Sequence, residues 1–502
     1  MLLWFSNAAA AQTIPTSPGP DSVDVTVYRD PNRAAGEPLN LNWLNGFALI
    51  SETRTITIPA GESDMRFEGV AGGIIPESAI VTDLPAGVIE KNQDAWLLSP
   101  ASLLDASLGR RVHIRRTSLA TGEVTETDAV VRSGAEGAVV LETQAGIEAL
   151  RCTGLPETLI YDRVPEGLSA KPTLSVRLRA QRETRAQVTL SYLATGFDWQ
   201  ANYVAELSED GEQMDLFAWL TLANGDETGF VRADTQAIAG RLNREGVVRL
   251  PEPNPRLELR CWPQGTTTSD LRQLLPPPPA PPPPPPVAMS DIVVTGARVA
   301  APEMQSTLAV AMVAEEEELG DLRLYRIPEP VSVAARSQKQ VALLERDSVP
   351  IEIVYRHRGG AGFSGGAIPV VTARNIDRER LGLALPAGQI AFFEEHEGRR
   401  LFAGRGQMRD IAVGEEVEIE LGRATAVQVQ ELVLERGEGR GAYRLTVTNA
   451  KPYPVRFEAE IGGPGTEIET DARLARRDGR PLWAVTVPAN GSATISYRLT
   501  AR

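Results

Sequence analysis

The chain has 502 residues, of which 42% are hydrophobic, and it carries a net charge of −15 at pH 7. This length predicts three or four domains. An acidic chain without a basic stripe cannot displace the counterions of a duplex or bind an anionic membrane surface, so nucleic acid and peripheral membrane binding are excluded. No stretch reaches the about 18 consecutive apolar residues of a membrane-spanning helix, so we expect no transmembrane segment.

The first residues resemble the end of an export signal. Residues 2–5 are apolar, and the alanines at 9–11 precede Gln12 in the manner of an A-x-A cleavage site. The run is short and has no basic n-region. We therefore interpret residues 1–21 as a signal-like remnant followed by a disordered N-terminus. The alternative is a disordered N-terminus on a cytosolic protein.

Glycine and proline are plentiful, at 44 and 37 residues, which is typical of short strands joined by turns. Residues 22–108 are predicted to form an N-terminal β-domain. Within it, residues 52–70 alternate apolar and polar side chains and predict a hairpin with one solvated face. Residues 99–109 predict a brief helical turn. Residues 109–150 contain short strands with Gly-containing turns, and they predict a small β-barrel-like insertion.

Longer strand patterns run through residues 151–264 and resume at 321–424, and we expect these two segments to build one central β-domain. The strand that contains Phe217 and Trp219 has apolar side chains on both faces, which predicts that it lies between two layers. Residues 265–320 are polar, then proline-rich, then acidic. Such a composition cannot bury enough apolar area to offset its ordering entropy, and it predicts a disordered insertion.

The alternation is clearest in residues 425–502, where Tyr443, Leu445 and Val447 share one face of a strand. About seven short strands in this length fit an immunoglobulin-like β-sandwich. The predicted fold class is therefore all-β. It consists of several antiparallel β-domains (sandwiches and a small barrel) that end in an immunoglobulin-like sandwich, with a disordered proline-rich insertion.

Five stretches of the chain resemble one known family. They read EKNQDAWLLSPASLLDASLGRRV (90–112), LPETLIYDRVPEGLSAKPTLSVRL (155–178), LSYLATGFDWQANYVAEL (190–207), LYRIPEPVSVAARSQKQVALL (324–344) and YRLTVTNAKPYPVRFEAEI (443–461). In this order, over most of residues 45–500, the sequence is similar to the bacterial domain of unknown function 4139, some members of which are labelled mucoidy inhibitor-like. The resemblance implies an exported, β-rich envelope protein, in the periplasm or associated with the outer membrane. It brings no known reaction, cofactor or catalytic residue.

The motifs that could indicate catalysis are weak. GFSGG (362–366) matches G-x-S-x-G, but strand-like residues follow it where a nucleophile elbow needs a helix, so a glycine-rich hairpin tip is favoured. Paired carboxylates in EEHEGRR (394–400) could serve glycoside hydrolysis, yet they lie in a predicted turn and are interpreted as solvated charges. No two of His113, His357 and His396 have the spacing of a helical metal site. We predict no catalytic, metal or cofactor site.

The stretch GFDWQANY (196–203) is the first candidate for a ligand surface. Trp199 and Tyr203 could form an aromatic platform for a sugar or a peptide, with Asp198 as its polar anchor. The alternative is that the large aromatic ring packs in the core while Asp198 satisfies a turn. Core packing is favoured, because the preceding strand already presents a buried face.

The two cysteines, Cys152 and Cys261, are too few for a structural zinc site. In an oxidising compartment they can form a disulfide, and two buried free thiols are the alternative. The sequence does not decide between them, because a disulfide needs Cα atoms within about 7 Å of each other.

The second candidate is a strand-like segment behind a proline-rich run. Residues 276–286 are prolines apart from one alanine, and they predict a polyproline II arm of roughly 34 Å. The segment that follows is Asp291, Ile292, Val293, Val294, Thr295 and Gly296. It resembles the TonB-box region of outer-membrane TonB-dependent receptors, although here it is internal and no plug or barrel follows. A disordered insertion without function is favoured over strand addition to a partner and over docking on its own domain.

Two functional classes are open at this point. The favoured one is a non-enzymatic binding or scaffold protein of the envelope, whose partner is an envelope protein or polymer. The alternative is a hydrolase acting on a cell-envelope polymer. An enzyme needs titratable groups brought close together with their pKa values pushed apart, whereas a binding module needs aromatic rings and satisfied polar groups on an exposed face.

Overall fold

The computed structural model describes residues 15–501 apart from a set of gaps. The gaps are residues 86, 95–97, 99, 119–120, 134–138, 150–156, 166–167, 241–312, 321, 359–361, 438 and 464. The predicted signal remnant therefore lies mostly outside the described residues. Cys152, Cys261 and the segment Asp291–Gly296 lie outside them as well, so the predicted disulfide and the predicted partner segment stay predictions.

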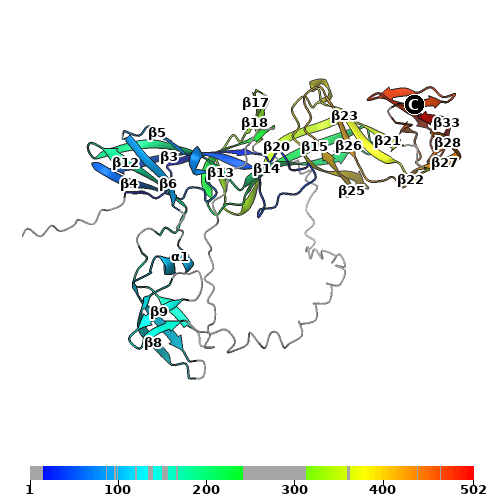
Figure 1. Ribbon diagram of the computed structural model, residues 1–502. Coiled ribbons are helices and arrows are strands. Elements are labelled where there is room, and N and C mark those ends of the chain that lie inside the picture. Colours follow the sequence, from blue (N-terminus) through cyan, green and yellow to red (C-terminus); the bar gives the residue numbers. More distant parts are fainter. Residues whose placement is uncertain are drawn as a thin grey trace, which may run out of the picture.

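The all-β fold class is confirmed. Strands form six sheets among the described residues, and the α-helix α1 (Pro100–Asp105) has only six residues. Figure 1 shows an elongated row of sheets with β4 and β12 at one end and β27, β28 and β33 at the other, while the unit that contains α1, β8 and β9 lies to one side. Within the described part of the chain, no helix is long and apolar enough to cross a membrane.

The N-terminal end of the row is a sandwich of two sheets. One sheet has the order β1 (Thr16–Ser17), β4 (Gly61–Glu68), β12 (Thr173–Ala180), β6 (Gly87–Asp94). The other has the order β17 (Glu315–Leu319), β18 (Leu322–Arg326), β16 (Phe230–Ala239), β2 (Ser22–Tyr28), β3 (Phe47–Ile58), β13 (Thr184–Thr195), β5 (Ile80–Thr82), and β19 (Val331–Val333) also pairs with β16.

The hairpin predicted for residues 52–70 is wrong. β3 pairs with β2 and β13, whereas β4 pairs with β1 and β12, so the turn between β3 and β4 carries the chain from one sheet to the other. Ile58 on β3 and Phe67 on β4 are both fully buried. Alternation in both strands therefore reflects one shared core between the sheets rather than a hairpin with a solvated face.

The middle of the row is a five-stranded sheet, called here the central sheet. Its order is β20 (Ser337–Pro350), β15 (Gln213–Asn224), β14 (Phe197–Leu207), β24 (Gly388–His396), β25 (Arg399–Met408). β14 and β24 run parallel, with Tyr203 opposite Ile390. One face of the central sheet belongs to the same hydrophobic core as the N-terminal sandwich.

The expected boundary between an N-terminal and a central domain does not match these sheets. β2 pairs in parallel with β16, and β3 pairs along its whole length with β13, so Val25 faces Thr235 and Ile50 faces Tyr192 across strands far apart in the sequence. The prediction followed sequence order, whereas the early strands β2 and β3 lie in one sheet with the later strands β13 and β16.

The C-terminal end of the row is a second sandwich. One sheet has the order β26 (Glu416–Glu420), β23 (Ile368–Arg374), β21 (Glu352–Arg358), β29 (Val455–Glu460), β32 (Arg480–Val487), β31 (Ala475–Arg477). The other has the order β22 (Ser364–Gly366), β27 (Val427–Gly437), β28 (Arg440–Asn449), β33 (Ser492–Ala501), β30 (Thr466–Glu469). Because β21 and β22 belong to these sheets, the sandwich begins well before the predicted residue 425. Ile353 on β21 packs against both this core and the central one.

The small lateral unit is a five-stranded sheet with its own core. Its order is β10 (Gly146–Ala149), β9 (Val140–Thr143), β8 (Val124–Val131), β7 (Arg111–Thr117), β11 (Glu157–Ile160). Leu104 from α1 belongs to this core, and Leu159 from β11 packs against it. The unit therefore extends past the predicted end at residue 150.

The predicted insertion at 265–320 also has a different end. Residues 241–312 are outside the described residues, but Glu315–Leu319 form β17, an edge strand paired with β18, and Val313 forms a parallel bridge with Ala342. A row of glutamates is typical of an edge strand, where charge prevents pairing with another chain.

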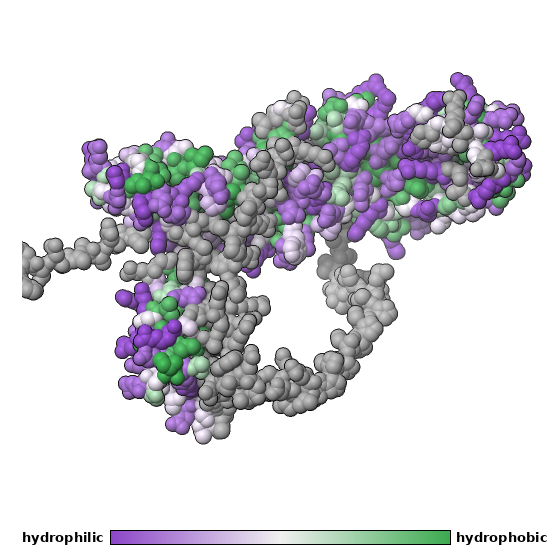
Figure 2. Space-filling model, in the orientation of Figure 1, coloured by the Kyte–Doolittle hydropathy of each residue, from purple (hydrophilic) through white to green (hydrophobic). Residues whose placement is uncertain are grey.

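Figure 2 shows apolar patches on the N-terminal sandwich and the lateral unit, while hydrophilic residues dominate the visible C-terminal end.

Candidate functional site

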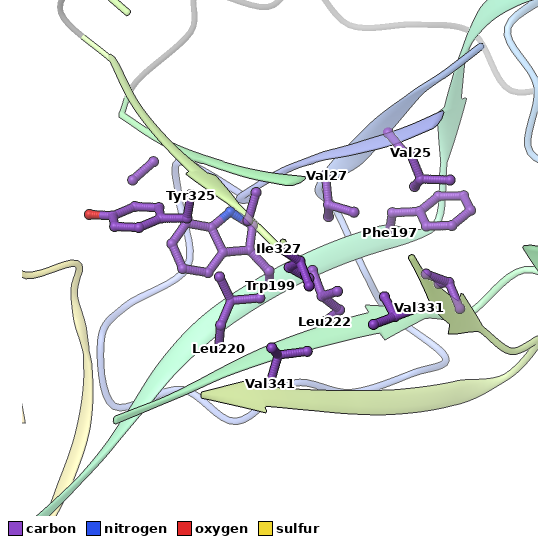
Figure 3. Close-up of a cluster of buried hydrophobic side chains, with 14 of the residues drawn as sticks. Val25, Val27, Phe197, Trp199, Leu220, Leu222, Tyr325, Ile327, Val331 and Val341 are labelled. Atoms are coloured by element: carbon purple, nitrogen blue, oxygen red, sulfur yellow. The ribbon is translucent and has the colours of Figure 1, made fainter. Parts of the chain in front are cut away.

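The first predicted ligand surface is part of the core. The Trp199 side chain is fully buried, its indole nitrogen donates to the carbonyl of Ile238 over 2.9 Å, and its ring meets Tyr325 edge-on with centroids 5.6 Å apart. Figure 3 shows the indole between Tyr325 and Ile327, above Leu220. No face of this ring is open to a ligand.

Asp198 and Tyr203 are buried as well. The Tyr203 hydroxyl donates to the carbonyl of Pro386 over 2.7 Å. Asp198 accepts from Arg33 over 2.8 Å and from the backbone N–H groups of Asp30 and Trp199 over 3.0 and 2.8 Å. Burial raises the pKa of Asp198 above its ordinary value, and Arg33 opposes the rise. The interpretation of these three residues as a ligand surface is wrong, because each has an internal partner and no exposure.

The opposite face of the same sheet is where aromatic rings reach solvent. Strand β15 buries one face in the core, through Met214, Leu216, Ala218 and Leu220. Phe217 and Trp219 point to the other face and are only half-buried. The prediction that β15 lies between two layers is therefore wrong, since no described element covers the rings of Phe217 and Trp219 completely.

Strand register places these rings in an ordered array. Trp219 lies opposite Asn202 on β14, which lies opposite Gln389 on β24. In the next row, Phe217 lies opposite Val204, which lies opposite Ala391.

One row further, Phe393 on β24 lies opposite Phe402 on β25. The rings of Phe217 and Trp219 meet edge-on at 4.7 Å, and those of Phe393 and Phe402 meet edge-on at 5.8 Å. We call the array of Phe217, Trp219, Phe393 and Phe402 the ring face. Strand spacing and rise place the Cα atoms of Phe217 and Phe393 roughly 12 Å apart.

Charges of both signs border the ring face. Arg400 lies over the ring of Phe393 at 5.9 Å and forms an ion pair with Glu206, while Arg405 lies over the ring of Phe402 at 5.8 Å. The arginines hold the phenylalanine rings by cation–π contact and bring little net charge, because acidic groups share the face. The ring face is therefore aromatic and amide-rich rather than a charged patch.

One end of the ring face is bounded by a loop, residues 33–45, which we call the strap. The Gln389 amide donates to the carbonyl of Gly36 over 2.8 Å, and the Gln338 amide donates to the carbonyl of Leu39 over 3.5 Å. Gln389 lies on β24 and Gln338 on β20, so the strap crosses the sheet from one side to the other. At its start, Arg33 donates to Gln200 over 2.9 Å in addition to Asp198.

This arrangement has the features of a binding surface. Partly exposed rings offer apolar faces for stacking, and the amides of Asn202 and Gln389 lie in the row of Trp219, where Asn202 accepts from Thr221 and Gln389 donates to Gly36. Among the residues that the structure describes, no group of three or more His, Cys, Asp or Glu side chains could hold a metal ion. Glu394, Glu395 and Glu397 are exposed at the tip of the β24–β25 hairpin, as predicted.

The other motifs of the sequence lie elsewhere. Ser364 of GFSGG is exposed on the short strand β22, which pairs with β27 and is followed by strand β23, not by a helix. The His357 side chain is buried, and burial lowers its pKa. His113 lies in the lateral unit, where its ring nitrogens contact Asp128 and Asp162 at 2.7 and 2.8 Å. These sites are not brought together with the ring face.

Sequence reasoning missed the ring face although the pattern contained it. Phe217 and Trp219 were recognised as a second apolar face, but that face was assigned to a second core layer. Phe393 and Phe402 lie on either side of the predicted turn. The useful signal was in β15, where Phe217 and Trp219 alternate with residues of the buried face. Phe402 gives no such signal, because its strand neighbours are exposed.

Comparison with known proteins adds no name to this geometry. No protein-family model and no curated protein matches the chain.

Proposed function

We propose that the protein is an exported, non-enzymatic binding or scaffold protein of the bacterial envelope, and that the ring face holds an envelope polymer. The observation that carries the proposal is that Phe217, Trp219, Phe393 and Phe402 gather on one face of the central sheet, where Phe402 is 58% exposed and the other three rings are partly exposed. Exposed aromatic rings on a rigid sheet provide large contact area at low cost in conformational entropy.

Export and family membership belong to the same proposal. The alanine-rich N-terminus and the resemblance to the domain of unknown function 4139 support a location in the periplasm or at the outer membrane. We also propose that the C-terminal sandwich is immunoglobulin-like, which fits a binding role, since such sandwiches present loops and faces to partners. Fractionation of bacterial cells that express the full chain tests this part. Recovery of the intact protein from the cytosol overturns it.

The binding experiment uses the full chain and two polymer probes. Purified peptidoglycan sacculi are co-sedimented with the protein, and extracted envelope polysaccharide is embedded in native gels to measure retardation. We expect binding to at least one probe, and we expect Phe217→Ala with Trp219→Ala to abolish it. Tyr453→Ala is the matched control, because Tyr453 is 50% exposed and lies between β28 and β29 of the C-terminal sandwich, not on the central sheet.

Two outcomes contradict the proposal. Unchanged binding in the Phe217→Ala, Trp219→Ala variant shows that the ring face is not the site. Release of new reducing ends from either polymer by the wild-type protein shows that the protein is a hydrolase.

A further inference from the structure

We propose that the polymer on the ring face is an uncharged glycan chain of N-acetylated sugars, and that Trp43 on the strap is its end contact. This inference rests on the proposed function of the ring face, and it adds the ligand chemistry and a fifth ring.

Trp43 is an exposed ring on a fixed loop. Its side chain is 78% exposed. The turn that carries it is closed by two contacts of Asn40, whose carbonyl accepts from the Trp43 N–H over 2.9 Å and whose side chain accepts from the Asn42 N–H over 3.0 Å. Leu44, the next residue, is buried and anchors the loop. A large apolar ring held in water by a buried neighbour is typical of a binding contact.

The strap approaches the end of the array two residues before Trp43. The carbonyl of Leu39 accepts from Gln338, which is paired with Ala223 on β15. Gly225 follows the end of β15, and a Cβ atom at this position would lie 2.3 Å from the Leu41 carbonyl oxygen, so only glycine lets the strap approach this closely. The segment that leads to Trp43 therefore lies against the end of the strand that also carries Trp219 and Phe217.

The spacing of the rings favours a glycan over a protein partner. A protein interface has a contiguous apolar centre from which water is excluded. Here the pair Phe217 and Trp219 is separated from the pair Phe393 and Phe402 by the side chains of Val204, Ala391 and Glu206, so a partner must present apolar faces at intervals with polar groups between them. A sugar chain does so, because each ring has an apolar face and a hydroxyl-bearing edge.

The side chains between the rings favour an N-acetylated, uncharged chain. Asn202 and Gln389 carry amides, and Val204 and Ala391 beside them are small and apolar. An acetamido group has an amide and a methyl group, and it matches both kinds of neighbour. The charged side chains on the same face are of both signs, with Asp215 and Glu206 against Arg400 and Arg405, so the face does not select a charged polymer.

Calorimetric titration of the full chain with soluble oligosaccharides tests the inference. The probes are the β-1,4-linked dimer and hexamer of N-acetylglucosamine and the glucose hexamer, cellohexaose. We expect the N-acetylglucosamine hexamer to bind at least about tenfold more tightly than cellohexaose. We expect Trp43→Ala to weaken hexamer binding by about tenfold and to leave dimer binding unchanged, because only the long chain reaches the strap. Tyr453→Ala serves again as the control.

The outcomes separate this inference from the proposed function. If Trp43→Ala binds the hexamer as the wild type does while Trp219→Ala loses it, the strap contact is wrong and the ring face stands. If cellohexaose binds as tightly as the N-acetylglucosamine hexamer, the assignment to N-acetylated sugars is wrong. If the wild type binds neither oligosaccharide but sediments with a polymer probe, the ligand chemistry is wrong and the proposed function stands. If it binds no probe at all, both fail.

Discussion

Arg33 and Asp198 form an ion pair of 2.8 Å in which the guanidinium side chain is 9% exposed and the carboxylate side chain 1% exposed. The pair joins the start of the strap to β14, and Arg33 also donates to the carbonyl of Trp199 over 2.6 Å. A charge pair removed from water is stable only when its remaining hydrogen bonds are satisfied. Here they are, so the strap is fixed to the sheet at the point where the ring face ends.

Replacing Arg33 by Met should destabilise the protein by about 3–5 kcal/mol, because a buried carboxylate is left without its cation. Chemical denaturation measures the change. Adding Asp198→Asn to this variant should restore part of the loss, since the uncompensated charge disappears. The control is Arg409→Met, whose ion pair with Glu415 is 65% and 44% exposed and should contribute little to stability, because water screens it. Equal effects of Arg33→Met and Arg409→Met would contradict the structural role of the buried pair.

Replacing Trp199 by Ala should cost roughly 3–5 kcal/mol, because it leaves a cavity between Tyr325 and Leu220 and removes the hydrogen bond to Ile238. The matched substitution Trp219→Ala should cost only ~1–2 kcal/mol, since part of that ring already contacts water. The denaturant midpoints of the two variants measure these two losses of stability. A midpoint unchanged by Trp199→Ala would show that the ring is not needed by the core.

The strand content of the fold could be predicted from the sequence, and the pairing could not. Alternation in residues 52–70 correctly indicated two strands, which are the second half of β3 and the whole of β4. It could not tell whether they face each other within one sheet or across two, because both arrangements bury the same side chains. Only the long-range partners β12 and β13 decide this, and period-two patterns contain no information on partners.

At the candidate site too, the sequence pattern shows which strand face is apolar but not what covers it. Burial of Trp199 was favoured from the sequence, because the neighbouring strand already had a buried face. The exposure of Phe217 and Trp219 was not predicted, because an apolar strand face looks alike whether another layer or solvent covers it. The strap adds a further obstacle, since it is far from β15 in the sequence and meets the end of that strand through Leu39, Leu41 and Leu44.

Replacing residues 241–312 by a short Gly/Ser linker should lower the melting temperature by only a few degrees. β16 ends at Ala239, which lies opposite Arg323 on β18, so the described residues on both sides of the segment belong to one sheet. The free energy of loop closure changes slowly with length. Calorimetry of the soluble variant measures the shift. Insoluble protein, or a loss of tens of degrees, would show that the segment contributes to a core.

The lateral unit should have a pH-dependent stability because of His113. Its ring nitrogens contact Asp128 on β8 and Asp162 just after β11, at 2.7 and 2.8 Å. Only the protonated ring donates to both carboxylates. These hydrogen bonds raise the pKa of His113 above its ordinary 6.5 and lower the pKa of Asp162 below its ordinary 3.8, with Arg111 lowering the latter further.

The direction of the effect follows from proton linkage. The His113 contribution is fully present below pH 6.5 and is lost as pH rises through the raised pKa of the folded state. The Asp162 contribution is present above pH 3.8 and is lost only as pH falls through its lowered pKa. Amide hydrogen exchange in β11 should therefore be slowest between pH 3.8 and pH 6.5 and faster at pH 9, once the measured rates are corrected for the intrinsic exchange rate of an unfolded chain. His113→Gln should remove the alkaline change while leaving exchange in β28 of the C-terminal sandwich unaltered. If the corrected protection of β11 is equal at pH 6 and pH 9 in the wild type, His113 does not hold β11 to the sheet through its charge.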